Sequence, residues 1–468
     1  MQFPKDFVWG VATSSYQIEG AVNEDGRQPS VWDEFSHQDG KTNHGDSGDI
    51  TCDFYHNYKE DIKLIKSLGI KNYRFSISWS RVLSYESDYQ GGAVKGKVNP
   101  KGLEFYDKVI DELLANGIEP WVTLYHWDLP FELERKGGWR NRDIMYYARD
   151  YAKLIAEHFE SKVKHFFTMN EMPCILGGYE GYFAPGLTVS LKELLNIIHN
   201  LLLTQGLMAK TIREICPNAK IGFAHNGNAM YPETDSKEDI RAMENAVQTF
   251  EEAIGYYAPA KGTKRLASDS LVYWCDPVFL GHYPEGAFEA FKGIMPEIKE
   301  GDMELISTPL DFFAYNTYQG SCIKAVKGDD KGFEVVRYAH GIDRTGAKWP
   351  ITPRSMRYFN EFICKRYKKP LYITENGVSN PDVVSDDGRV HDPQRIQFAK
   401  DYLRNLALAI EDGADIRGYF HWSIFDNFEW ARGFDERFGM VYVDYQTQKR
   451  IPKDSAYWYK ELIETNQI

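Results

Sequence analysis

The chain has 468 residues, of which 43% are apolar and 26% are charged, and its formal net charge is −13. This balance is typical of a globular protein with a large buried core, and it excludes a largely disordered chain. The negative charge argues against nucleic acids and anionic membranes as partners, and no apolar run approaches the roughly 18 residues that a membrane span needs.

Two further features indicate the compartment. Residues 1–10 contain Pro4, Lys5 and Asp6 and lack the apolar stretch of a signal peptide. The six cysteines are spread along the chain without a CxxC pair, which favours reduced structural thiols. We therefore expect a cytoplasmic protein.

Eight short apolar segments alternate with longer amphipathic segments along the chain. The first helical segment, 53–68, has apolar residues near a 3.6-residue period, and Gly69 follows it as a stop signal. The predicted strands are 7–12, 72–77, 120–125, 165–169, 220–224, 311–315, 371–374 and 418–422. The predicted helices are 53–68, 100–115, 142–157, 191–215, 236–255, 353–367, 393–412 and 454–464.

This alternation predicts parallel βαβ units. The favoured α/β architecture is a (β/α)8 TIM barrel formed by residues 1–468 as a single domain, with elaborated loops at the C-terminal mouth. An open doubly wound sheet is the alternative, although neither nucleotide-binding pattern, GxGxxG or GxxxxGKS/T, occurs where it would be needed. Segments 321–327 and 333–337, around a Gly-rich turn at 328–332, predict a β-hairpin over the mouth.

Polar residues at the strand ends are the candidates for chemistry, because barrel active sites lie at the C-terminal face. The fourth strand runs into Asn170-Glu171 and the seventh into Glu375. Barrel closure would bring the two glutamates to one rim, and two opposed carboxyl groups are what glycosidic bond cleavage requires. The alternative is that both glutamates form structural salt bridges at the rim.

The other strand ends supply amides, imidazole and indole groups. Such groups can hydrogen-bond hydroxyls in pairs or pack against the apolar face of a pyranose. No HExxH or other metal-ligand spacing is present, so we expect no metal and no cofactor. The candidates for a sugar pocket are Gln17, His126, Trp127, Asn170, Asn316, Trp422, Glu429 and Trp430.

Five blocks in this chain resemble motifs of glycoside hydrolase family 1, the β-glucosidase family, and the resemblance covers essentially the whole chain. The blocks include Tyr73-Arg74-Phe75-Ser76-Ile77-Ser78-Trp79-Ser80-Arg81, His126-Trp127-Asp128-Leu129-Pro130, Thr374-Glu375-Asn376-Gly377 and Asp426-Asn427-Phe428-Glu429-Trp430. The resemblance implies a (β/α)8 barrel and hydrolysis with retention of anomeric configuration.

Residue roles also follow from the resemblance. It implies that Glu375 is the nucleophile and Glu171 the acid/base. Arg74, Tyr318 and Asn316 match residues that support the nucleophile. The residues that match the pocket for the non-reducing sugar and the neighbouring leaving-group side are Gln17, His126, Trp127, Asn170, Trp349, Trp422, Glu429 and Trp430.

Elementary electrostatics gives expectations for the two carboxyl groups. Arg74 should lower the pKa of Glu375, and the charge of Glu375 should raise the pKa of Glu171. Retention predicts a carboxyl separation of about 5–5.5 Å.

Two sequence details bear on the site. The family usually has Asn-Glu-Pro, whereas this chain has Asn170-Glu171-Met172-Pro173, so the restriction that proline imposes falls on Met172 instead of Glu171. In the branch that acts on 6-phosphorylated sugars, serine usually stands where this chain has Glu429. A carboxylate there would repel a phosphate, which favours unphosphorylated glycosides.

The resulting hypothesis is a retaining exo-β-glycosidase that removes terminal β-D-glucosyl residues from β-glucosides and cello-oligosaccharides, as in cellulose degradation. A β-galactosidase, a β-fucosidase or a transglycosylating member of the family is the nearest alternative. A non-catalytic glycan-binding protein is the alternative from another class.

Overall fold

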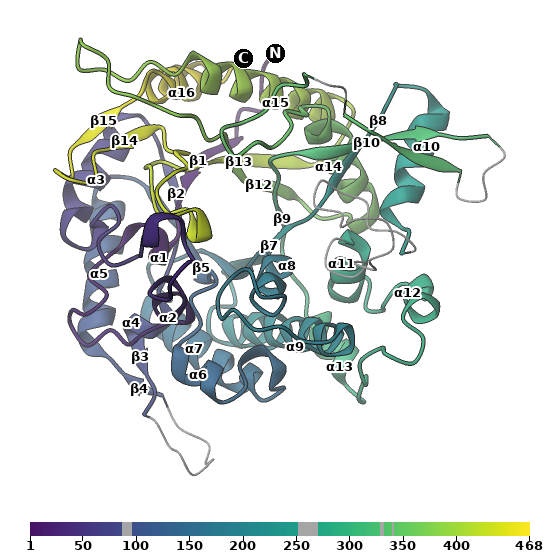
Figure 1. Cartoon of the computed structure of the whole chain (residues 1–468), viewed down its shortest axis with the longest axis horizontal. Helices are drawn as coiled ribbons and strands as arrows, with labels where there is room; N and C mark the ends of the chain where they lie inside the picture. Colours follow the sequence, from purple (N-terminus) through teal and green to yellow (C-terminus); the bar gives the residue numbers. More distant parts are fainter. Residues whose placement is uncertain (87–95, 251–269, 328–331, 339–340) are drawn as a thin grey trace.

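The computed structural model describes residues 1–86, 96–250, 270–327, 332–338 and 341–468 (Figure 1). At its centre is a closed barrel in which each strand pairs in parallel with the next. This confirms the predicted (β/α)8 barrel, and every predicted strand segment is found in it. The barrel strands are β1 (Val8–Ala12), β2 (Asn72–Ser76), β5 (Glu119–Tyr125), β6 (His165–Asn170), β7 (Lys220–Asn226), β9 (Phe313–Asn316), β12 (Leu371–Asn376) and β13 (Ile416–Trp422).

Helices surround the barrel, and the two chain ends lie side by side (Figure 1). The amino group of Met1 donates to the carbonyl oxygen of Ile468 at 2.6 Å. No helix within the described ranges is both long and apolar enough to cross a membrane. The predicted helices correspond to α3 (Phe54–Ser67), α5 (Pro100–Ala115), α7 (Ile144–Phe159), α9 (Leu191–Ile215), α10 (Lys237–Val247), α14 (Ser355–Tyr367), α15 (Pro393–Glu411) and α16 (Asp454–Thr465).

Two helix predictions differ from the structure. The helix expected over 236–255 ends at Val247, and residues 251–255 lie outside the described residues. Helix α11 (Leu271–Phe279) was not predicted. It contains Pro277 and is buried from Leu271 to Val278, so it has no polar face that would reveal a helical period.

The remaining elements are short. They are α1 (Ser15–Ile18), α2 (Val31–Ser36), α4 (Trp79–Val82), β3 (Leu83–Ser84), β4 (Lys97–Val98), α6 (Phe131–Arg135), α8 (Met172–Ile175), β8 (Ala229–Pro232), α12 (Glu285–Ala290), α13 (Asp302–Ile306), β10 (Gly320–Ala325), β11 (Phe333–Val336), β14 (Val441–Val443), β15 (Arg450–Pro452) and the 3-10 turns η1 (Asn43–Gly45), η2 (Gly138–Arg140), η3 (Leu176–Gly178) and η4 (Trp430–Arg432).

The predicted hairpin exists but does not cover the barrel mouth. Strands β10 and β11 pair antiparallel, and residues 328–331 of the expected turn lie outside the described residues. β10 also pairs in parallel with β8 and packs on α10, so the hairpin belongs to a separate sheet at the edge of the molecule (Figure 1). Among the described residues of the segment, those that line the cavity are Gln319, Ala347 and Trp349, at its two ends.

Aromatic side chains fill the barrel interior. The ring of Trp121 lies 5.1 Å from that of Phe420, and the ring of Phe167 lies 5.3 Å from that of Phe312. All four side chains are buried. The guanidinium carbon of Arg74 lies 4.9 Å from the centre of the Phe167 ring, so the aromatic core supports this buried cation.

Register irregularities direct polar residues into the barrel. In a regular strand Thr374 and Glu375 would face opposite sides. β12 shifts its register against β9 just before Glu375, and both side chains bond inside the barrel, Thr374 to Asn316 and Glu375 to Arg74. β6 has a similar shift before Asn170. Such irregularities commonly re-aim side chains beside active sites.

The aromatic interior gives a prediction about stability. Phe420 is fully buried, so Phe420→Ala should lower the free energy of unfolding by about 3–5 kcal/mol through lost burial and an unfilled cavity. Phe288 is 48% exposed, and Phe288→Ala is the matched control, with an expected change within about 0.5 kcal/mol. Urea denaturation of both variants measures the difference, and equal effects would contradict the packing described for the interior.

Candidate active site

A cavity of about 740 Å³ lies at the carboxyl ends of the barrel strands. Glu171 and Glu375 both line it and are only 6% and 4% exposed. The structure thus brings the two predicted glutamates to one site. The lining residues at or directly after strand ends include His126 after β5, Glu171 after β6, Asn226 in β7, Asn316 in β9, Glu375 in β12 and Trp422 in β13.

Glu375 is held by a cation and a hydroxyl group. Arg74 Nη1 donates to Oε1 of Glu375 at 2.7 Å, and the Tyr318 hydroxyl donates to Oε2 at 2.9 Å. Arg74 is fully buried, and its other donors bind Asn170 Oδ1 at 2.6 Å and Thr123 Oγ1 at 3.1 Å. A guanidinium group can only donate hydrogen bonds, so Glu375 Oε1, Asn170 Oδ1 and Thr123 Oγ1 must all act as acceptors.

Glu171 has neutral partners instead. Asn316 Nδ2 donates to Oε1 of Glu171 at 2.8 Å, and the Cys174 thiol lies 3.2 Å from Oε2 as a donor. Asn316 Nδ2 also donates to Asn170 Oδ1 at 3.0 Å, while Thr374 Oγ1 donates to Asn316 Oδ1 at 2.6 Å. Asn316, which was expected to support Glu375, thus bonds directly to Glu171, although it also lowers the pKa of Glu375.

These environments act differently on the pKa values of the two carboxyl groups. Burial, and then the charge of Glu375, raise the pKa of Glu171 to about 8. Burial also raises the pKa of Glu375, and Arg74 and Tyr318 oppose that rise. The expected lowering by Arg74 is present, but burial outweighs it. Because only Glu375 contacts a cation, it ionises first and Glu171 retains its proton at neutral pH.

His126 lines the cavity and is held by Asn170. Its Nε2 accepts from Asn170 Nδ2 at 3.0 Å, so the hydrogen-bond network assigns the ring proton to Nδ1. Burial and the charge of Arg74 hold the pKa of His126 well below its usual value, so the ring is neutral. Nδ1 is itself buried and has no hydrogen-bond partner among the described residues.

Aromatic rings and one further carboxyl group form the rest of the lining. The rings of Trp127 and Trp430 lie 4.6 Å apart, and Trp422 stacks on His126 at 5.8 Å. Trp422 Nε1 donates to Glu429 Oε1 at 3.4 Å, and burial raises the pKa of Glu429 well above its usual value. Trp349 lies on Tyr318 and also lines the cavity, with 5.4 Å between the ring centres.

Two predicted pocket residues stand behind the lining. Gln17 Nε2 donates to Asn427 Oδ1 and to the carbonyl oxygen of Phe428, and Gln17 Oε1 accepts from Ser14. Asn170 uses its amide on Arg74, Asn316 and His126. Neither side chain is part of the cavity lining, so in this structure each orients its neighbours.

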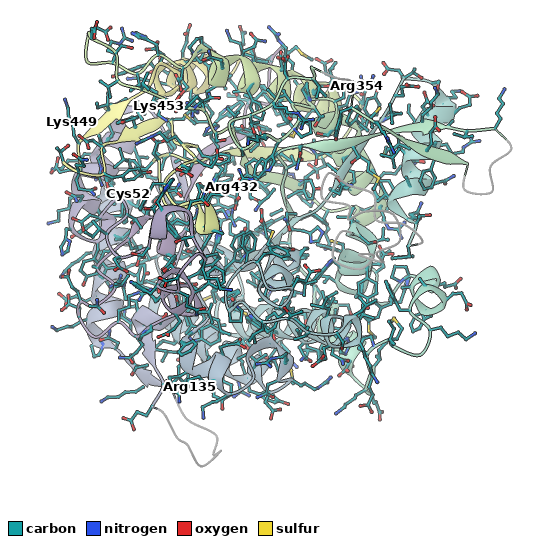
Figure 2. The ribbon with its side chains drawn as sticks, in the orientation of Figure 1. Cys52, Arg135, Arg354, Arg432, Lys449 and Lys453 are labelled. Atoms are coloured by element: carbon teal, nitrogen blue, oxygen red, sulfur yellow. The ribbon has the colours of Figure 1, made fainter. Side chains whose placement is uncertain are left out.

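Several lining residues were not predicted from the sequence. Asn226 ends β7, which runs two residues beyond the predicted strand, so a longer strand would have drawn attention to it. Cys174 lies one turn after Glu171, and nothing in its sequence context marks it. Arg432, labelled near the middle of Figure 2, also lines the cavity and pairs with Glu436 at 2.8 Å. In the described part of the chain, no three His, Cys, Asp or Glu residues are grouped to hold a metal ion.

Comparisons with known proteins agree on one family. Beta-glucosidase A of Acetivibrio thermocellus is 42% identical to this chain, over 99% of the chain and 98% of that protein. The 1,4-beta-D-glucan glucohydrolase of Thermotoga neapolitana is 40% identical over 100% of the chain and 99% of that protein.

A solved structure also matches over the whole length. The beta-glucosidase of Thermotoga maritima has a TM-score of 0.86 and 40% identity, covering 100% of this chain and 99% of that chain. It has been solved in complex with glucoimidazole and in complex with a galacto-hydroximolactam.

The family model described as Glycosyl hydrolase family 1 matches residues 1–468. The match covers the whole chain, and relatives at about 40% identity align over nearly their whole length, so the entire barrel falls within the family. This chain therefore belongs to glycoside hydrolase family 1.

Proposed function

We propose that this protein is a retaining β-glucosidase that hydrolyses terminal, non-reducing β-D-glucosyl residues through a covalent glycosyl-enzyme. One observation carries the proposal: two carboxyl groups line one cavity, and only one of them contacts a cation. Glycosidic cleavage needs this pairing of an ionised and a protonated carboxyl group. The names of the relatives support glucosides as substrates.

In the first step, Glu375 attacks the anomeric carbon as a carboxylate. Arg74 and Tyr318 orient both of its oxygens and keep it ionised. Glu171 delivers its proton to the leaving-group oxygen, because its raised pKa keeps it protonated at neutral pH. The bond from Glu375 to the anomeric carbon forms as the glycosidic bond breaks.

The second step reverses these roles. Once Glu375 is esterified its charge is gone, and so is one cause of the raised pKa of Glu171. Glu171 then accepts a proton from water, and the water oxygen attacks the anomeric carbon while Glu375 leaves as a carboxylate. Both attacks reach the same carbon from opposite faces, so the product retains the anomeric configuration.

The lining suits an unphosphorylated sugar. His126 and Glu429 both line the cavity and can hydrogen-bond sugar hydroxyls, and the carboxyl group of Glu429 can accept from two of them. The indole rings of Trp422 and Trp430 can pack against the apolar face of the sugar ring. Trp349 lines the same cavity beside Tyr318 and can serve as a platform for the leaving group. This is in keeping with β-glucosides and cello-oligosaccharides as substrates, and thus with a part in cellulose degradation.

A β-galactosidase activity is the second candidate. The same pocket can bind an axial or an equatorial 4-hydroxyl, and the Thermotoga maritima relative, solved with a gluco- and a galacto-configured ligand, supports both. We also propose that residues 1–468 act as one catalytic domain, since β1 and β13 from opposite ends of the chain pair directly. The six free cysteines support a reducing, cytoplasmic location.

Removal of the nucleophile is the first test. Glu375→Ala should lower hydrolysis of aryl β-glucosides by about 10⁴-fold or more, because no covalent intermediate can form. Azide can occupy the space left by the carboxylate, so added azide should restore turnover and give the α-glucosyl azide. A β-configured product would exclude retention, and unchanged hydrolysis would exclude Glu375 as the nucleophile.

The acid/base role gives a second prediction. Glu171→Ala should slow substrates with poor leaving groups by about 10²–10⁴-fold, but should affect the first step much less when the leaving group is good. In the parent enzyme, kcat/KM should fall above an apparent pKa of about 8 as Glu171 loses its proton. That alkaline limb should be absent from Glu171→Ala. Equal losses for good and poor leaving groups would remove Glu171 from the acid role.

Glu429 gives a third prediction. Glu429→Ser removes a carboxyl group that can hydrogen-bond two sugar hydroxyls, so kcat/KM for neutral aryl β-glucosides should fall about 10- to 100-fold. The parent should prefer the neutral substrate to its 6-phospho counterpart, because the carboxyl group of Glu429 offers a phosphate no positive charge and repels it when ionised. Parallel assays of both substrates measure this preference. A parent enzyme that prefers the phosphorylated substrate would overturn the role given to Glu429.

A further inference from the structure

The two steps described above leave unexplained one short hydrogen-bonded chain at the acid/base. Asn226 Nδ2 lies 3.0 Å from Cys174 Sγ as a donor, and Cys174 Sγ lies 3.2 Å from Glu171 Oε2. All three residues line the cavity. This hydrogen-bonded chain joins the end of β7 to the first turn of α8. It ends on Oε2 of Glu171, whereas Asn316 bonds to Oε1.

Local backbone structure brings the thiol to the carboxyl group. Glu171 directly precedes α8, and its carbonyl oxygen accepts from the backbone N–H of Cys174 at 2.9 Å, so residue 174 lies one turn above it. Glu171 adopts a left-handed conformation with φ of 45°. A proline at position 172 would hold the preceding residue in an extended conformation, whereas Met172 permits this turn.

The polarity of each hydrogen bond follows from its neighbours. Thr374 donates to Oδ1 of Asn316, so the amide of Asn316 turns its N–H groups toward Asn170 and Glu171. Oε1 of Glu171 is therefore always an acceptor, and the proton of neutral Glu171 resides on Oε2. Because Asn226 donates to the sulfur, the S–H of Cys174 is left to face Oε2.

We propose that Cys174 is a positioning residue for Glu171: Asn226 orients its thiol, and the S–H donates to Oε2 whenever Glu171 is ionised. The same oxygen then releases the proton in the first step and recovers it in the second. This inference rests on the proposed acid/base role of Glu171. It adds a residue that acts through Glu171 in one protonation state and that forms and breaks no covalent bond itself.

The proton balance closes without any change at the thiol. In the first step the proton moves from Oε2 to the leaving oxygen, and the S–H turns to the new anion. In the second step water gives a proton to Oε2, and the hydrogen bond from the thiol to Oε2 is released. Cys174 stays protonated throughout, because burial and the charge of Glu171 raise its pKa well above the usual range.

A weak donor fits this position. A thiol donates weakly, so it lowers the pKa of Glu171 only slightly and leaves the group protonated at neutral pH. A cation at the same distance would favour the ionised form strongly and remove the acid. The thiol can therefore hold the carboxylate in place between the two steps without depleting the acid before the first.

The test compares three cysteine variants. Cys174→Ala removes the donor, and Cys174→Ser keeps one. Cys364→Ala is the matched control, because Cys364 is a half-buried thiol on α14 that is not part of the cavity lining. Each variant is assayed with aryl β-glucosides across pH, and its melting temperature is recorded as a check on folding.

The expected results separate positioning from general structural support. In Cys174→Ala the alkaline limb of kcat/KM should move up by about 0.5 pH unit, since the ionised form has lost a weak hydrogen bond. With a good leaving group the second step limits kcat, so kcat should fall about three- to tenfold. Cys174→Ser should restore both values toward the parent, and Cys364→Ala should match the parent.

Defined outcomes would overturn the inference. An unshifted alkaline limb in Cys174→Ala, or a serine variant that behaves like the alanine variant, contradicts the positioning role. If Cys174→Ala does not fold, Asn226→Ala keeps the thiol but removes its orientation, and a smaller upward shift of the limb is expected; no shift counts against the role. Failure of the Glu171→Ala leaving-group test would instead remove the acid/base assignment itself, so the two failures are distinguishable.

Discussion

The site depends on one buried guanidinium group. Arg74 is fully buried against the ring of Phe167, and an unpaired cation there would be very costly, so Glu375 has to accompany it as an anion. Because the guanidinium only donates, it also fixes the amide of Asn170, which in turn fixes the tautomer of His126. One buried charge thus determines which of these groups around the cavity donate hydrogen bonds and which accept them.

The same arrangement costs stability. Burial raises the pKa of Glu171, Glu375 and Glu429, so each binds its proton more tightly in the folded chain than in the unfolded one. Such groups penalise folding as the pH rises above the ordinary carboxyl range. The aromatic interior and the paired barrel strands offset this cost. Chemistry at the cavity is therefore obtained at the expense of local stability, as is common at active sites.

Much of the fold and the pair of glutamates could be predicted from the sequence. The strands are short apolar runs between amphipathic helices, and strand order follows chain order, so closure into a barrel needed no long-range information. Glu171 and Glu375 directly follow or end such runs, which places them at the mouth. The prediction failed for α11, where a buried helix has no polar face, and for the placement of the hairpin over the mouth, because its partner strand β8 had not been identified.

The sequence by itself determined the barrel, the family motifs and which carboxyl groups meet. Only the tertiary structure decided which atoms bond. Alternation along a regular strand would separate Thr374 from Glu375, and a register shift in β12 brings both into the interior. The same holds for Asn316, which bonds to Glu171, and for Cys174. Hydrogen bonds near 3 Å between different strands depend on closure and local register, and neither can be read from spacing along the chain.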